Sequence, residues 1–182
     1  RTAVQGLMEL PFHRRDVLET RITGRVWTYG DDVNTDVIFP GKYTYSISDR
    51  REMAEHALED LDPDFVNKVQ PGDIIVAGKN WGCGSSREQA VICLKEIGVG
   101  AIVARSFARI YFRNCINEGL PIVTSDAVDT VDSGDEIAID FESGKVTTPG
   151  GGYTFPPLAP SVMEILDAGG LVAHVKQKLG LD

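Results

Sequence analysis

The feature that most constrains this chain is a short polar loop, residues 80–88, between an apolar run and an amphipathic segment. Residues 73–77 before the loop are typical of a short buried strand, and residues 88–97 after it carry apolar side chains at helical spacing. The loop contains two glycines, two serines and an arginine. We therefore predict a strand, a glycine-rich turn and a helix that Ser85 or Ser86 caps.

Such a loop is suited to a carboxylate or a phosphate. The free amides and the positive dipole end of a helix favour a nearby anion, and Gly82 and Gly84 allow close approach to the backbone. Arg87 offers a planar pair of donors that fits a carboxylate, and a serine hydroxyl such as that of Ser85 could serve there as a general base. The alternative, that these side chains only cap the helix, has equal support from the local pattern.

Three well-known loop motifs do not fit these residues. A phosphate-binding Walker loop requires lysine where the chain has Ser85, and a dinucleotide fingerprint requires glycine where it has Arg87. Arg87 also breaks the pattern of a hydrolase nucleophile elbow. Arg105, after the next apolar run, leaves open a weaker interpretation of the chain as an NADP-binding domain.

The remaining patterns predict alternating strands and helices followed by a hairpin, in one domain. A chain of 182 residues usually forms a single core, so we predict an N-terminal extension over residues 1–20 and one α/β domain over residues 21–182. Ser48 is expected to cap the first long helix, and Gly119 is expected to end a later one. The expected strands cover residues 21–28, 73–77, 101–104, 121–124, 136–141 and 145–148, and the expected helices cover residues 48–58, 88–97, 106–118, 159–168 and 171–179.

Three arginines recur every fourth residue in and just before the expected helix 106–118. Arg105, Arg109 and Arg113 would then share one helical face. This basic stripe could contact a substrate or a partner, or it could be a solvated face whose charges pair with acids such as Glu118.

Three separated segments, in order, carry a family resemblance. They are residues 32–40, residues 82–88 and residues 104–114. With them the chain resembles the swivelling domain of the aconitase superfamily, and in particular the separate small subunits of isopropylmalate isomerases, over about residues 22–178. The resemblance implies a swivelling β/β/α three-layer domain of the aconitase C-terminal-domain type.

The resemblance also implies a reaction and the residues that perform it. The family moves a hydroxyl between adjacent carbons of a hydroxy-dicarboxylate by dehydration and rehydration. On this basis Ser85 is the base, Arg87 binds a substrate carboxylate and Ser86 adds a hydrogen bond. Thr35 and Asp36 match the family's active-site loop, in which Thr35 contacts substrate and Asp36 orients the serine or a water.

The expected specificity loop follows that segment. Tyr43, Thr44, Tyr45 and Ser46 occupy the place where the family contacts the variable arm of the substrate. A tyrosine with an apolar ring and a polar tip is compatible with isopropylmalate or with another methylated malate. Related hydro-lyases, such as homoaconitase or dimethylmalate dehydratase, remain alternatives.

The cysteines argue against a metal cluster in this chain. Cys83, Cys93 and Cys115 lack close spacing and fall on different expected elements, whereas a [4Fe-4S] cluster of this family requires three cysteine ligands. The resemblance therefore implies that a large iron-sulfur subunit carries the cluster and that this chain is active only with that partner. A non-catalytic regulatory subunit is the remaining alternative.

Composition limits the partners and the compartment. The net charge of −9 argues against nucleic acid, and no apolar run approaches the roughly 20 residues needed to cross a bilayer. Three cysteines without framework spacing suit a reducing compartment, so we expect a cytoplasmic protein.

Overall fold

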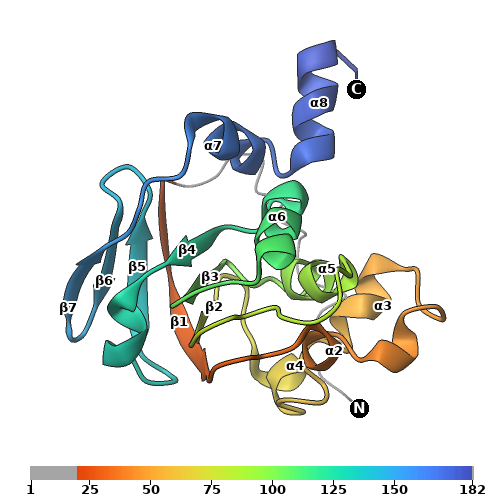
Figure 1. Cartoon of the computed structure of the whole chain (residues 1–182), viewed down its shortest axis with the longest axis horizontal. Coiled ribbons are helices and arrows are strands. Elements are labelled where there is room, and N and C mark those ends of the chain that lie inside the picture. Colours follow the sequence, from red (N-terminus) through yellow and green to blue (C-terminus); the bar gives the residue numbers. More distant parts are fainter. Residues whose placement is uncertain (1–19, 182) are drawn as a thin grey trace.

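The computed structural model describes residues 20–181 and contains one mixed seven-stranded sheet with helices (Figure 1). The strand order is β4-β3-β2-β1-β5-β6-β7. The strands are β1 (Arg21–Tyr29), β2 (Ile74–Ala77), β3 (Ala101–Ala104), β4 (Ile122–Thr124), β5 (Glu136–Asp140), β6 (Lys145–Thr148) and β7 (Gly151–Thr154). The helices are α2 (Thr35–Ile38), α3 (Arg50–Ala54), α4 (Phe65–Lys68), α5 (Gln89–Glu96), α6 (Arg109–Glu118), α7 (Pro160–Asp167) and α8 (Leu171–Leu179), with the 3-10 turns η1 (Gly41–Tyr43) and η2 (Asp126–Thr130).

The parallel half of the sheet contains β1 to β4. Every residue of β2 and β3 is buried, as expected for strands that are covered on both faces. Helices α5 and α6 connect β2 to β3 and β3 to β4, which are the crossovers that parallel pairing requires. Gly119 ends α6 in the left-handed region, with φ of 74°, as the sequence predicts.

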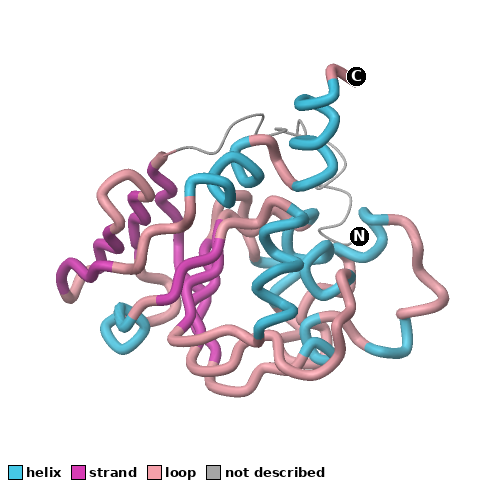
Figure 2. Tube along the Cα trace, turned by 45° about the horizontal axis from the view of Figure 1, so that its top comes forward, coloured by secondary structure: helices cyan, strands magenta, loops and turns pink. Residues whose placement is uncertain are grey.

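Strand β1 joins this half to an antiparallel half. It pairs parallel with β2 and antiparallel with β5, and it buries Ile22 and Val26. In Figure 1 the antiparallel strands, the parallel strands and helices α5 and α6 follow one another from left to right. Figure 2 likewise shows most helices on one side of the strands. The expected β/β/α fold class is confirmed. Strand β7 was not predicted, because its two glycines give no apolar alternation.

The expected caps of α3 and α5 and the expected start of α6 are wrong. Helix α3 is capped by Asp49 instead of Ser48, because the Asp49 carboxylate accepts hydrogen bonds from two first-turn amides at 3.0 Å. Helix α5 has Glu88 at its N-cap, without a side-chain bond, so neither Ser85 nor Ser86 caps it.

Helix α6 begins at Arg109, three residues after the expected start. A β-bridge between Trp81 and Phe107 keeps the residues before Arg109 extended. Arg105 therefore precedes the helix and does not share a helical face with Arg109. It pairs instead with acidic residues of η2. The expected N-terminal extension covers residues 1–20, of which residues 1–19 lie outside the described residues, so the extension and the domain boundary at residue 21 stay predictions.

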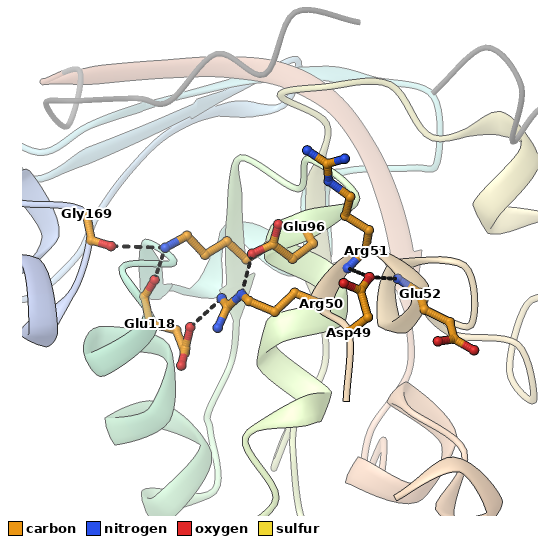
Figure 3. A network of polar contacts seen from close by, with 8 residues as sticks. Asp49, Arg50, Arg51, Glu52, Glu96, Glu118 and Gly169 are labelled. Atoms are coloured by element: carbon orange, nitrogen blue, oxygen red, sulfur yellow. Dashed lines mark hydrogen bonds and ion pairs between the residues drawn. The ribbon is translucent and has the colours of Figure 1, made fainter. Parts of the chain in front are cut away.

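A polar network fixes the helices on the α side of the sheet (Figure 3). Arg50 of α3 donates to Glu96 at the end of α5 and to Glu118 at the end of α6, both at 2.7 Å. Lys95 donates to the carbonyl oxygens of Glu118 and Gly169, the latter at 3.0 Å. Burial lowers the pKa of Lys95. The network ties α3, α5, α6 and the turn after α7 together, and so fixes the frame on which the site loops rest.

Candidate active site

Two loops that leave adjacent parallel strands lie side by side. The amide of Thr35, after β1, donates to the carbonyl oxygen of Cys83, after β2, at 2.8 Å. The amide of Gly82 donates to the carbonyl oxygen of Val33, also at 2.8 Å. The carboxyl ends of neighbouring parallel strands meet at one edge of a sheet, which is where α/β proteins place ligands. This pairing brings residues 34–38 to residues 80–88.

Both glycines of the loop are required by its packing. Gly82 has φ of 78°, and a Cβ there would overlap the ring of Tyr111 in α6. Gly84 has φ of 98°, and a Cβ there would overlap the side-chain amide of Asn34. Other residues are strained in this backbone region. The glycines therefore let the loop lie against α6 and against the neighbouring loop.

The Arg87 guanidinium is the centre of the polar cluster. Its Nε donates to Ser85 Oγ at 2.7 Å, and its two outer nitrogens contact Thr44 Oγ1 and the carboxylate of Asp36. The Arg87 side chain is 18% exposed, whereas that of Asp36 is 60% exposed. Arg87 is thus a mostly covered cation that three segments hold from different sides.

Ser85 is exposed but its hydroxyl is held in place. Its Oγ lies 2.7 Å from Arg87 Nε and 3.2 Å from Thr35 Oγ1, and its amide donates to Thr35 Oγ1 at 3.1 Å. Thr35 itself is buried, with 1% of its surface exposed. A cation next to a hydroxyl oxygen favours the deprotonated form of that hydroxyl. The arrangement therefore suits a serine that removes or returns a proton.

The other expected site residues divide into two groups. Thr44 joins the Arg87 cluster, and Ser86 is exposed next to Ser85. Tyr43 instead packs its ring against His56, with centroids 3.9 Å apart, and its hydroxyl lies 3.3 Å from the Glu59 carboxylate. Tyr45 is fully exposed and Ser46 is exposed, so the far part of the loop extends into solvent.

Several supporting residues escaped the sequence-based interpretation. Asn114 of α6 donates to the carbonyl oxygen of Ser86 at 3.1 Å, and the Asn34 side chain accepts the amide of Asp36 at 2.8 Å. Trp81, within the loop, is wholly buried. Asn114 lies in the third resemblance segment, and an asparagine just before a short helix is a common cap, so both signals were present in the sequence.

The described residues give no site for a metal ion in this chain. Within residues 20–181, no group of three histidine, cysteine, aspartate or glutamate side chains is placed to hold one. Cys93 and Cys115 are wholly buried, and burial raises the pKa of both thiols, so they are held as neutral side chains. Arg105 pairs with Asp126 and Asp129, so its charge is balanced within the fold. The interpretation of the chain as an NADP-binding domain therefore gains no support from this arginine.

Comparison with known proteins identifies the family. Residues 36–127 match the model of the aconitase C-terminal domain. The 3-isopropylmalate dehydratase small subunit of Thermodesulfovibrio yellowstonii is 46% identical over 165 residues, which cover 89% of this chain and 98% of that protein. The chain belongs to the family of 3-isopropylmalate dehydratase small subunits.

Further small-subunit relatives agree with this assignment. Small subunit 1 of Thermotoga maritima is 50% identical over 158 residues, covering 86% of this chain and 95% of that protein. The methanogen homoaconitase small subunit of Methanothermobacter thermautotrophicus is 50% identical over 161 residues, covering 86% and 92%. A crystal structure of 3-isopropylmalate dehydratase (leuD) from Methanocaldococcus jannaschii superimposes with a TM-score of 0.83 at 42% identity, covering 87% of this chain and 95% of that one.

The small-subunit assignment confirms the family predicted from the three sequence segments. As a small subunit, the chain belongs to an enzyme with a second, large subunit. None of the helices in residues 20–181 has the length and apolar character to span a bilayer.

Proposed function

We propose that this chain is the small subunit of a two-chain hydro-lyase that interconverts 2-isopropylmalate and 3-isopropylmalate, a step of leucine biosynthesis. The observation that carries the proposal is the exposed Ser85 hydroxyl, held 2.7 Å from the Arg87 guanidinium and 3.2 Å from Thr35. A proton acceptor next to a carboxylate-binding cation is what removal of a proton beside a substrate carboxylate requires.

Each residue of the cluster then has a role. Ser85 takes and returns the proton on carbon, and Arg87 binds a carboxylate and stabilises the Ser85 oxygen while it is negative. The Thr35 hydroxyl positions Ser85 by accepting a hydrogen bond from its amide. The exposed Ser86 adds a hydrogen bond to the substrate.

Asp36 gives the site a resting state. Its carboxylate contacts the outer nitrogen of Arg87, which a substrate carboxylate would also use. Substrate must therefore share or replace this contact, and the largely exposed Asp36 is free to turn toward a water or toward Ser85. The contact balances the positive charge of Arg87 until substrate arrives.

The partner in this proposal is a large subunit with a [4Fe-4S] cluster, so the active site is complete only in the complex. When bound there, the cluster supplies Lewis-acid chemistry for the departing hydroxyl. This chain supplies the base and the carboxylate clamp on an exposed edge, open to an approaching subunit. The reducing cytoplasm is the compartment that suits its three unpaired cysteines.

The substrate's variable arm is proposed to be apolar. Lys42, the one cation in residues 41–46, pairs with Glu59 at 2.7 Å and lies over the Tyr43 ring. It is thus engaged within the fold, and the loop offers no free charge for the additional carboxylate of a tricarboxylate. This favours isopropylmalate over the substrate of a homoaconitase. The comparison with homoaconitase is needed because a homoaconitase small subunit is also 50% identical to this chain.

The test is reconstitution of the chain with its large subunit, followed by isomerase assays on 2-isopropylmalate and on homocitrate. Loss of a general base lowers a rate by about 10²- to 10⁴-fold, so Ser85→Ala should do the same while the complex still forms. Arg87→Lys should raise KM and lower kcat, because lysine has no planar pair of donors. Ser143→Ala, on an exposed hairpin turn, is the matched control and should retain wild-type activity.

Two results would contradict the proposal. One is full activity of both Ser85→Ala and Arg87→Lys in an assembled complex, which would remove the site. The other is turnover of homocitrate without turnover of isopropylmalate, which would replace the proposed substrate by that of a homoaconitase.

A further inference from the structure

Helix α6 presents an exposed face that the fold does not use. The face consists of Arg109, Ile110 and Arg113, here called the α6 patch, and all three residues are exposed. Ile110 leaves 50% of its surface in solvent. The opposite side of the helix is buried through Tyr111 and Cys115. The patch is therefore an apolar side chain between two cations on an otherwise packed helix.

The two arginines of the patch are not paired with carboxylates of the described residues. Within residues 20–181, Arg109 and Arg113 have no ion pair with an acidic residue. Four other arginines each pair with at least one carboxylate; they are Arg25, Arg50, Arg87 and Arg105. The chain holds 27 acidic and 18 basic residues, so acids are in excess. Glu118, which the sequence suggested as a partner, binds Arg50 instead.

The patch borders the loop that carries Ser85. Asn114, one turn after Ile110, donates to the carbonyl oxygen of Ser86 at 3.1 Å. The amide of Ala108, just before the patch, donates to the carbonyl oxygen of Trp81 at 2.9 Å. The patch is thus fixed to the candidate active site by hydrogen bonds on both sides of Ile110.

Five of the eight large apolar side chains exposed within residues 20–181 lie on α8 or just after it, and two of the other three lie beside the Ser85 loop. Outside α8 and the residues that follow it, the large apolar side chains exposed within residues 20–181 are Tyr45, Leu61 and Ile110. Tyr45 follows Thr44, which contacts Arg87, and Ile110 lies next to the Asn114 contact. Two of the three therefore flank the Ser85 loop. Exposed apolar groups around a polar site are typical of a surface that a partner covers.

We propose that the α6 patch is a docking surface for an acidic segment of the large subunit at the rim of the shared active site. The inference rests on the proposed function, because a partner that reaches Ser85 must also approach the helix beside it. Carboxylates of the partner would bind Arg109 and Arg113, and its apolar side chains would cover Ile110. Charge complementarity favours an acidic segment as the occupant of this basic patch. A second copy of this chain is a less suitable partner, because two chains of net charge −9 repel each other.

The test measures binding of the purified large subunit to this chain by calorimetry. The double variant Arg109→Glu/Arg113→Glu should bind at least about tenfold more weakly, and the deficit should shrink at about 0.5 M salt, where the charges are screened. Ile110→Asp should also weaken binding. The matched control is Arg21→Glu/Lys145→Glu, the same charge change on exposed residues of β1 and β6, which should bind within about twofold of wild type.

The outcomes separate this inference from the proposed function. Ser85→Ala should bind the large subunit like wild type, while its activity falls by about 10²- to 10⁴-fold. Normal binding of the Arg109→Glu/Arg113→Glu variant, with its circular dichroism spectrum unchanged, would overturn the docking surface and leave the function intact. Failure of the wild-type chain to bind the large subunit would overturn both. A change in self-association of the variant, measured by sedimentation without the large subunit, would assign the patch to a second copy and also overturn the inference.

Discussion

The contact between Thr35 and Ser85 gives the sharpest prediction about the site. Thr35 is buried, and its Oγ1 accepts the Ser85 amide at 3.1 Å and lies 3.2 Å from Ser85 Oγ. Thr35→Val keeps the volume and removes these bonds. A hydrogen bond of this kind contributes about 1 kcal/mol net, and the unpaired amide is next to solvent at the exposed Ser85.

The size of the effect on the rate follows from this energy. If the bonds that position the Ser85 hydroxyl are made in the transition state, a loss of about 1 kcal/mol lowers kcat by roughly five- to tenfold, since about 1.4 kcal/mol corresponds to tenfold. KM should change little, because Thr35 is covered by Ser85 and the neighbouring loop. The assay is steady-state isomerase kinetics of the reconstituted complex, with thermal unfolding of the isolated chain measured in parallel.

A second variant at the same position separates positioning from stability. Thr35→Ser keeps the hydroxyl but removes a buried methyl group, which costs about 1 kcal/mol of unfolding free energy. The two variants should therefore be similarly destabilised, while only Thr35→Val loses most of its kcat. Equal loss of kcat in both, or none in Thr35→Val, would refute the positioning role.

Three further predictions concern the frame of the site. Gly82→Ala should lower the free energy of unfolding by at least about 2 kcal/mol, because the positive φ is strained for alanine and the added Cβ overlaps a tyrosine ring of α6. Arg50→Ala should cost about 1 to 3 kcal/mol in urea unfolding, because it leaves two mostly covered carboxylates without their shared cation. Iodoacetamide at about pH 8 should label Cys83 alone in the folded chain, since burial raises the pKa of the Cys93 thiol and keeps it protonated.

Each of these has a control and a contrary result. Gly134→Ala adds a Cβ that meets nothing within 4 Å, at φ of 97°, so it isolates the strain and should cost about 1 kcal/mol; equal losses at the two glycines would remove the packing argument. Lys68→Ala breaks an exposed ion pair and should change stability by less than about 0.5 kcal/mol; a loss equal to that of Arg50→Ala would count against the network.

The buried cysteine also predicts the direction in which the unfolding free energy changes with pH. Burial raises the pKa of the Cys93 thiol in the folded chain above its ordinary value of 9.0. The unfolded chain therefore releases that proton first as pH rises. The unfolding free energy should be unaffected well below pH 9.0 and should fall above it. Labelling of Cys93 in the native chain as fast as in denaturant would contradict the burial.

Local sequence patterns were enough for most of the fold. The apolar runs of β2 and β3 predicted buried strands, and Gly119 predicted the end of α6, because both depend on neighbouring residues only. Strand β7 was missed, and the caps of α3 and α5 and the start of α6 were misplaced. A bridge between Trp81 and Phe107 determines where α6 begins, and those two residues are distant along the chain. A helix start set by such a contact leaves no local signal.

The sequence by itself determined the chemistry available to this protein: the loop of residues 80–88, with its serine and arginine, and the order of three family segments. Only the tertiary structure decided how those groups meet. It placed Asp36 and Thr44 on Arg87, set buried Thr35 against Ser85, and left Arg109 and Arg113 unpaired beside the site. The physical reason is that adjacent parallel strands bring their carboxyl ends together, so loops about 50 residues apart in sequence share hydrogen bonds.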